Sequence, residues 1–229
     1  QDKRQLNTPN NLRASKTLFD YLSNNGDPRF QDFYNEASNG GYNPMKQGNH
    51  NAATAELDPD DVSVVHVEPT DPVYFISAAD SHFMQAEVAV EHGLGDAQTH
   101  YNAGVMAAFN MLGRDGSSFI AGGGAYEFPT GGTDADKMKA IMMQKWVGFT
   151  RFQGIEGWIE WKRTGYPEVN TGGYDASDYE PGQFVSPITN SLGDNEFPLR
   201  MLYPQSERSQ NPNTPDQVAI NQPVWWDQD

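Results

Sequence analysis

The 229-residue chain contains no cysteine. This absence excludes disulfide bonds, zinc–thiolate sites, iron–sulfur clusters and cysteine nucleophiles. It does not decide the compartment, because a chain of this length can bury about 70% of the surface that its unfolded form exposes and needs no covalent cross-links.

Basic residues and long apolar runs are also scarce. There are 15 Lys and Arg against 31 Asp and Glu, which gives a formal net charge of −16. A surface of this charge repels phosphate backbones, so we expect no nucleic-acid partner. The longest apolar stretches are far shorter than the ~20 residues that a membrane-spanning helix needs. Residues 1–4 do not resemble a signal peptide, and we expect the chain to be a mature or excised piece.

Uncharged polar residues take the place of the missing charges. The sequence has 18 Asn, 14 Gln, 22 Gly and 15 Pro, and 12% of its residues are aromatic. Aromatic rings can stack on the apolar faces of sugars while neighbouring amides bond the hydroxyls. The composition therefore favours long ordered loops that bind neutral polar ligands. The aromatic residues expected in loops are Tyr42, Tyr126, Tyr174, Tyr179, Phe184, Trp225 and Trp226.

The middle of the chain has helical periodicity. Apolar residues in 77–92 recur at steps of four, three and four, Ser77 is placed to cap the helix, and Gly93 is placed to end it. Asp96 precedes a second periodic segment, residues 97–112. Because about four residues connect the two, we expect an antiparallel helix hairpin.

Two further helices are expected after a glycine-rich loop at 113–132. The third begins after Thr133, and the fourth ends at Gly165. We predict one core cluster between them, formed by Met142, Trp146, Ile155 and Trp158.

Outside residues 77–165 the apolar periodicity is weak. We expect a short helix at 12–23, a short strand at 62–67 and little regular structure after residue 167. The fold class predicted is mainly α, with helix hairpins, long ordered loops and little β structure. We interpret residues 1–229 as one domain portion, with a helical core at about 73–167 and loop-rich flanks at 1–72 and 168–229.

Catalytic templates are missing. The sequence has no G-x-S-x-G, phosphate-loop or H-E-x-x-H motif. Glu156 and Glu160 stand four apart on one helix face, whereas a glycosidase needs carboxylates on both sides of the scissile bond. Acidic runs at 58–61 and 175–180 could give oxygens to calcium, but neither has EF-hand spacing. We therefore expect no catalytic residues, no metal and no cofactor.

Six short segments, in order along the chain, resemble those of the SusD/RagB-like nutrient-binding family. They are residues 27–29 (DPR), 74–87 (YFISAADSHFMQAE), 95–101 (GDAQTHY), 141–146 (IMMQKW), 156–167 (EGWIEWKRTGYP) and 198–204 (PLRMLYP). Asp80 and His82 depart from the family pattern. Family members are also usually about twice this length and begin with a lipoprotein cysteine, so the chain resembles a C-terminal portion.

The resemblance implies tetratricopeptide-like helix pairs and a non-catalytic role. Such proteins are lipoproteins on the outer membrane of Bacteroidetes, where they take part in polysaccharide utilization. They bind glycans, or peptides in some members, and deliver them to a SusC-like TonB-dependent transporter. The membrane would then be reached only through a lipid anchor outside this chain.

Alternatives and ligand residues stay open at this point. A peptide-binding member of the family and a protein-interaction scaffold built on helix hairpins are the alternatives to a glycan binder. The candidate ligand residues are Trp225, Trp226, Tyr174 and Tyr179. We expect one of the neighbouring indoles to pack on the body and the other to face solvent or a cleft, because side chains alternate along an extended segment.

Overall fold

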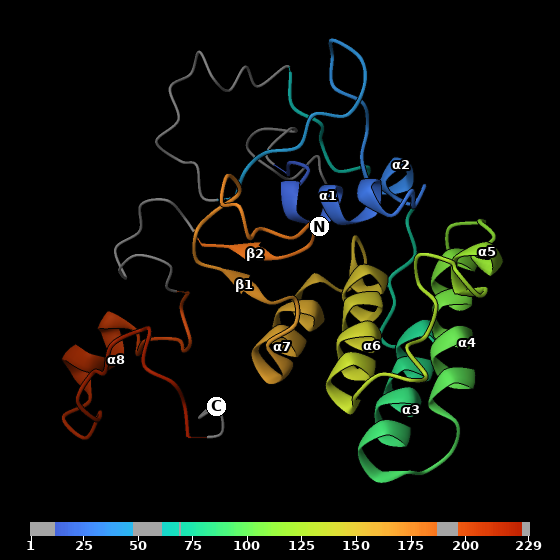
Figure 1. The fold of residues 1–229 in the computed structure, drawn as a ribbon. Helices are drawn as coiled ribbons and strands as arrows, with labels where there is room; N and C mark the ends of the chain where they lie inside the picture. The colour runs from blue at the N-terminus through green and yellow to red at the C-terminus, as the bar shows by residue number, and fades with distance from the viewer. Residues whose placement is uncertain (1–11, 48–60, 69, 187–196, 226–229) are drawn as a thin grey trace.

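The computed structural model describes residues 12–47, 61–68, 70–186 and 197–225, and it is mainly helical, as predicted (Figure 1). Its helices are α1 (Lys16–Asn24), α2 (Phe30–Phe33), α3 (Ala78–His92), α4 (Ala97–Asn110), α5 (Ser117–Ile120), α6 (Asp134–Phe149), α7 (Gly154–Thr164) and α8 (Gln205–Gln210). Two short parallel strands, β1 (Val169–Asn170) and β2 (Phe184–Val185), pair with Val169 opposite Phe184. No helix among the described residues is long and apolar enough to cross a membrane.

Helices α3 and α4 form the predicted antiparallel hairpin (Figure 1). The Ser77 hydroxyl accepts a hydrogen bond from the Asp80 amide at 3.0 Å, and Gly93 ends α3 with φ 66°. The Asp96 side chain caps α4. A Cβ at Gly104 would lie 2.7 Å from the Phe83 ring, so glycine allows the two helices to approach closely. The hairpin core is fully buried around Phe83 and Val105.

Helix α6 packs against this hairpin and α7 packs against α6 (Figure 1). The predicted start of α6 is confirmed, because Thr133 and Asp136 form a reciprocal capping box. The predicted end of α7 is also confirmed, since Gly165 adopts φ 71°.

The predicted core cluster between α6 and α7 is wrong. Trp158 is 42% exposed and Ile155 is 76% exposed, whereas Trp161 is 7% exposed. The reason is the rotation of α7 about its axis. Gly157 faces α6, where its Cβ position lies 3.6 Å from Phe149. Trp158 therefore lies only at the edge of this contact, in a shallow pocket with Trp146, and Ile155 points away from it. The Trp161 indole donates a hydrogen bond to the Pro167 carbonyl at 3.0 Å.

The other two members of that expected cluster belong to different parts of the core. Met142 packs with the α3–α4 hairpin. Trp146 is half-buried, and its ring lies 5.6 Å from that of Phe184 and 6.2 Å from that of Tyr21.

The N-terminal segment differs from the prediction in two places. Helix α1 begins at Lys16 rather than at residue 12, and the expected strand at 62–67 forms only single bridges, of Val64 with Arg13 and of Val65 with Tyr34. Backbone hydrogen bonds of this segment go to three different neighbours, residues 12–14, 33–35 and 43, so no continuous ladder forms.

The glycine-rich segment at 113–132 contains α5 and folds back on itself. The Tyr126 amide bonds the Phe119 carbonyl at 2.8 Å, and the Tyr126 and Phe128 side chains are buried. Residues 197–225, which include α8, lie away from the helical body in Figure 1. The Phe197 ring nevertheless contacts Trp161, with 5.1 Å between ring centroids.

Candidate functional site

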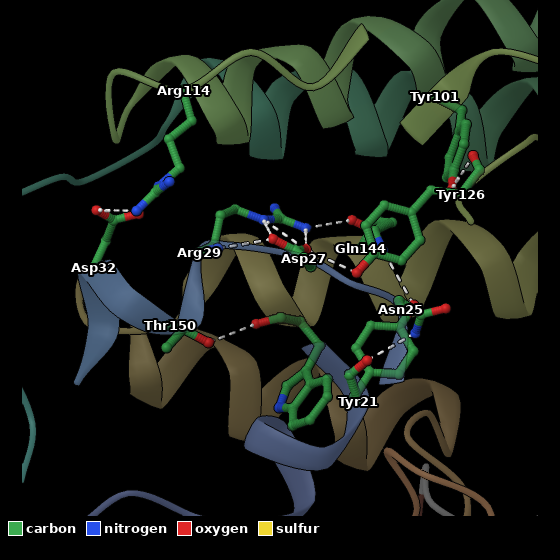
Figure 2. A network of polar contacts seen from close by, with 11 residues as sticks. Tyr21, Asn25, Asp27, Arg29, Asp32, Tyr101, Arg114, Tyr126, Gln144 and Thr150 are labelled. Carbon is green, nitrogen blue, oxygen red and sulfur yellow. Dashed lines mark hydrogen bonds and ion pairs between the residues drawn. The ribbon is translucent and has the colours of Figure 1, made fainter. Parts of the chain in front are cut away.

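Asp27 and Arg29 form a buried ion pair (Figure 2). Asp27 follows α1 and Arg29 precedes α2, and both side chains are 0% exposed. The Arg29 guanidinium donates from Nε to Asp27 Oδ1 at 3.1 Å and from Nη2 to Oδ2 at 2.6 Å. It also lies 4.0 Å from the centroid of the Phe109 ring. A buried charge of this kind is tolerated only when it is paired and hydrogen-bonded.

Three uncharged side chains complete this first network. Arg29 Nη2 donates to Gln144 Oε1 at 3.0 Å, Gln144 Nε2 donates to the Tyr21 hydroxyl at 3.1 Å, and the Tyr126 hydroxyl donates to Asp27 at 2.7 Å (Figure 2). Burial raises the pKa of Tyr21 to about 12 and that of Tyr126 further, so both phenols stay neutral. The network joins α1, α6 and the 121–127 loop.

A second network joins α3, α6 and α7. Lys145, 4% exposed, lies 3.1 Å from Glu160 and 3.5 Å from Asp80. Arg163 pairs with Glu160 at 2.8 Å and with Glu87 at 2.5 Å. Burial alone would raise the pKa of Glu160, but the Arg163 hydrogen bond and the Lys145 charge outweigh it, and the pKa is lowered. Glu160 is therefore held as a partner of these two cations.

The two networks explain four of the six sequence segments. Asp27 and Arg29 come from DPR, and Gln144 comes from IMMQKW, whose next residue, Lys145, belongs to the second network. The other two segments, 74–87 and 156–167, supply the carboxylates and the arginine of the second network. Because these side chains are bonded to one another, they connect the segments of the fold.

An open cleft of about 310 Å³ lies beside the first network. Six separate parts of the chain line it: α1, α4, the 121–127 loop, α6, the segment around residue 168 and the segment at 180–183. The lining residues are Tyr21, Tyr101, Ala125, Tyr126, Glu127, Asp136, Lys139, Ala140, Met143, Glu168, Glu180, Pro181, Gly182 and Gln183. The volume is at the lower end of the roughly 300–1,000 Å³ of small-ligand sites.

The cleft has an aromatic and aliphatic floor with a polar rim. Tyr101, Tyr126 and Met143 are buried, whereas the carboxylates of the rim are exposed. Tyr101 donates its hydroxyl hydrogen to the Tyr126 carbonyl at 3.1 Å, which fixes the floor. A concave apolar surface with a few polar groups is typical of small-molecule binding sites.

Most carboxylates of the rim also have a partner in the protein. Glu127 accepts from the Gly123 amide at 2.7 Å, and Glu168 accepts from Lys139 at 2.7 Å. The Asp136 carboxylate accepts from Thr133, and this bond lowers the Asp136 pKa. The Glu168 hydrogen bond raises the Lys139 pKa. Asp136 and Lys139 therefore keep their charges near neutral pH.

Those residues predicted to contact a ligand that the structure describes lie outside the cleft. Tyr174 and Tyr179 are half-buried and contact each other, with 5.2 Å between ring centroids, and the Tyr174 hydroxyl is 2.9 Å from that of Thr17 in α1. Trp225 is 85% exposed, and Trp226 lies outside the described residues. None of the three described residues lines the cleft.

The sequence reasoning missed the cleft because its lining is assembled from distant segments. Among the lining residues, only Tyr126 is one of the aromatic residues expected in loops, and its neighbour Glu127 carries no pattern of its own. Within the described ranges, no group of three His, Asp or Glu side chains could hold a metal ion. Asp175 bonds Lys46 at 3.0 Å, and residues 58–60 of the other acidic run lie outside the described part.

Comparison with known proteins identifies the family. A family model described as "Starch-binding associating with outer membrane" matches residues 2–204. The chain belongs to this SusD-like family. The family predicted from the six segments is thus confirmed. No curated protein matches the chain.

Solved SusD homologues have the same fold. One from Bacteroides thetaiotaomicron is 22% identical, with a TM-score of 0.73 over 95% of this chain and 52% of that one. One from Bacteroides ovatus is 20% identical, with a TM-score of 0.70 over 94% and 52%. A chitin-binding SusD homologue from Flavobacterium johnsoniae is 21% identical, with a TM-score of 0.68 over 94% and 49%. The chain therefore spans about half the length of these SusD-like structures.

Proposed function

We propose that this SusD-like chain is part of a non-catalytic glycan-binding protein of the bacterial outer surface. The observation that carries the proposal is the match of residues 2–204 to a family of starch-binding proteins associated with the outer membrane. The cleft beside the first network supports it, since it combines an apolar floor with acceptors for sugar hydroxyls. The bound oligosaccharide would then pass to a SusC-like TonB-dependent transporter, with a lipid anchor on a part of the protein beyond this sequence.

The contacts of the cleft carboxylates favour binding over hydrolysis. A general acid needs a raised pKa, whereas the hydrogen bond from Thr133 lowers that of Asp136. Glu127 holds the Gly123 amide and Glu168 holds Lys139, so both have partners within the protein.

A blocking substitution tests the cleft as the glycan site. Ala125 is exposed and lines the cleft, whereas Ala121 is exposed in the same loop and does not. We expect Ala125→Trp to weaken oligosaccharide binding by at least tenfold in isothermal titration calorimetry, and Ala121→Trp to leave it unchanged. Equal affinities of the two variants would show that the glycan binds elsewhere.

The two C-terminal tryptophans are tested in the same way. If Trp225 or Trp226 is a stacking platform for a sugar, Trp225→Ala or Trp226→Ala lowers the affinity, because the contact between the indole face and the sugar ring is lost. Unchanged affinity in both variants rules out the platform. Binding of peptides without any glycan binding would favour the peptide-binding alternative.

A further inference from the structure

The rim of the cleft carries an unbalanced charge. Four carboxylates, those of Glu127, Asp136, Glu168 and Glu180, line it together with one cation, Lys139. The chain as a whole has a net charge of −16, so its general field has the same sign as the cleft.

The single lysine does not offset this charge for a ligand. Its ammonium group is 2.7 Å from Glu168, and this hydrogen bond raises the Lys139 pKa. An incoming anion would therefore have to compete with a carboxylate that already holds the cation.

The carboxylates still have room for donors from a ligand. A carboxylate offers about four lone-pair sites, and the known partner of Glu127 is bound to one oxygen, Oε2. The rim is thus rich in acceptors and poor in donors. A ligand that brings N–H or O–H donors fits it, and one that brings further acceptors with negative charge does not.

We propose that the cleft selects glycans by charge: it prefers a sugar unit with a free, protonated amino group to a neutral unit, and it rejects a uronate. This inference rests on the proposed glycan-binding function and adds the substrate class. The floor of Tyr101, Tyr126 and Met143 would accommodate the ring, and the rim carboxylates would accept hydrogen bonds from the ammonium group. Hydrogen bonds to an ionised group are shorter and stronger than those between neutral groups.

The experiment compares three β-1,4-linked tetrasaccharides that differ in charge: fully deacetylated chitosan, chitin and glucuronan. We expect titration calorimetry at about pH 6 and low salt to give an affinity for chitosan at least roughly tenfold above that for chitin, with glucuronan weakest. Raising the ionic strength should narrow the differences. Equal affinity for chitosan and chitin, or stronger binding of glucuronan than of chitin, would overturn the inference.

Charge variants separate the cleft from the general field of an acidic protein. Glu180→Gln and Glu127→Gln, combined, should reduce the preference for chitosan to within about threefold. Glu156→Gln removes the same charge per residue from an exposed site on α7 outside the cleft, and it should keep the preference. A preference that survives the double variant would overturn the inference.

Two further results distinguish this inference from the proposed function. If chitin binds in a manner that Ala125→Trp abolishes but without charge preference, the function stands and the inference fails. If no tetrasaccharide binds, the function fails, and methyl NMR of Met143 with glucosamine and with glucuronate decides the inference separately. A shift with glucosamine alone supports charge selection in the cleft, and any other result overturns it. Met201, 96% exposed and outside the cleft, serves as the reference signal.

Discussion

Helices α6 and α7 are neighbours with similar apolar spacing, yet they are buried to different extents. Helix α6 buries side chains on several faces, against the α3–α4 hairpin, α1 and α7. In α7 the only buried side chain is that of Trp161, and Ile155, Trp158 and Ile159 are exposed. Apolar periodicity therefore identified both helices but did not show how many neighbours each has.

The polar residues of the two helices differ in the same way. Gln144 and Lys145, at the centre of α6, are 1% and 4% exposed. They hold the two networks, to which α7 contributes only the partners Glu160 and Arg163. Charged residues are seldom buried unless they are paired, so the interior position of Lys145 depends on these carboxylates.

The largest effect is expected at the buried pair next to α6. Arg29→Met leaves Asp27 buried without its cation and should lower the free energy of unfolding by about 3–5 kcal/mol in urea denaturation. The matched control is Arg114→Met, since Arg114 pairs with Asp32 in a more exposed position (Figure 2). That variant should lose less than about 1 kcal/mol. Equal losses would mean that the first network does not stabilise the fold.

A smaller effect separates the two tryptophans of α7. Trp161→Ala removes a buried ring and its hydrogen bond to Pro167, and we expect a loss of about 3 kcal/mol. Trp158→Ala removes a ring that is 42% exposed and should cost about 1 kcal/mol or less. Thermal and urea unfolding of the two variants measure the difference. If Trp158→Ala is the more damaging one, its face of α7 is buried in solution.

Local signals made the helices predictable from the sequence. Ser77, Asp96 and Thr133 are caps, and Gly93 and Gly165 are terminators, because each satisfies or ends the backbone bonding of its own helix. These interactions span only a few residues, so the sequence contains all the information needed to find them.

Features that depend on distant partners could not be found in this way. The sequence alone could not choose between Trp158 and Trp161 as the buried ring, since that choice depends on where Gly157 meets Phe149. The cleft presents the same difficulty, because Glu127 and Glu180 come together only after six segments have folded. The networks lie between these cases: the segments that form them were recognised, but not their contacts.

The smallest effect on stability is expected from the Glu160 carboxylate, which α7 places beside Lys145 of α6, and this effect depends on pH. The pKa of Glu160 is lowered in the folded protein, although burial opposes this, because Arg163 and Lys145 stabilise the carboxylate. A lowered pKa means that the folded state binds the proton less readily than the unfolded state. The stabilisation from Glu160 is therefore present above its unfolded pKa of about 4.3 and is lost as the pH falls through the folded value.

Because the Glu160 pKa is lowered in the folded state, the effect of Glu160→Gln on stability should depend on pH. At pH 7 the variant should unfold at a lower urea concentration than the parent chain, and the gap should close as the pH is lowered below about 4, where the parent carboxylate is protonated as well. Glu156→Gln, at an exposed position one turn earlier on the same face of α7, should show no such gap at any pH. A gap for Glu160→Gln that is independent of pH would mean that its hydrogen bonds, rather than its charge, hold α7 to Lys145 of α6.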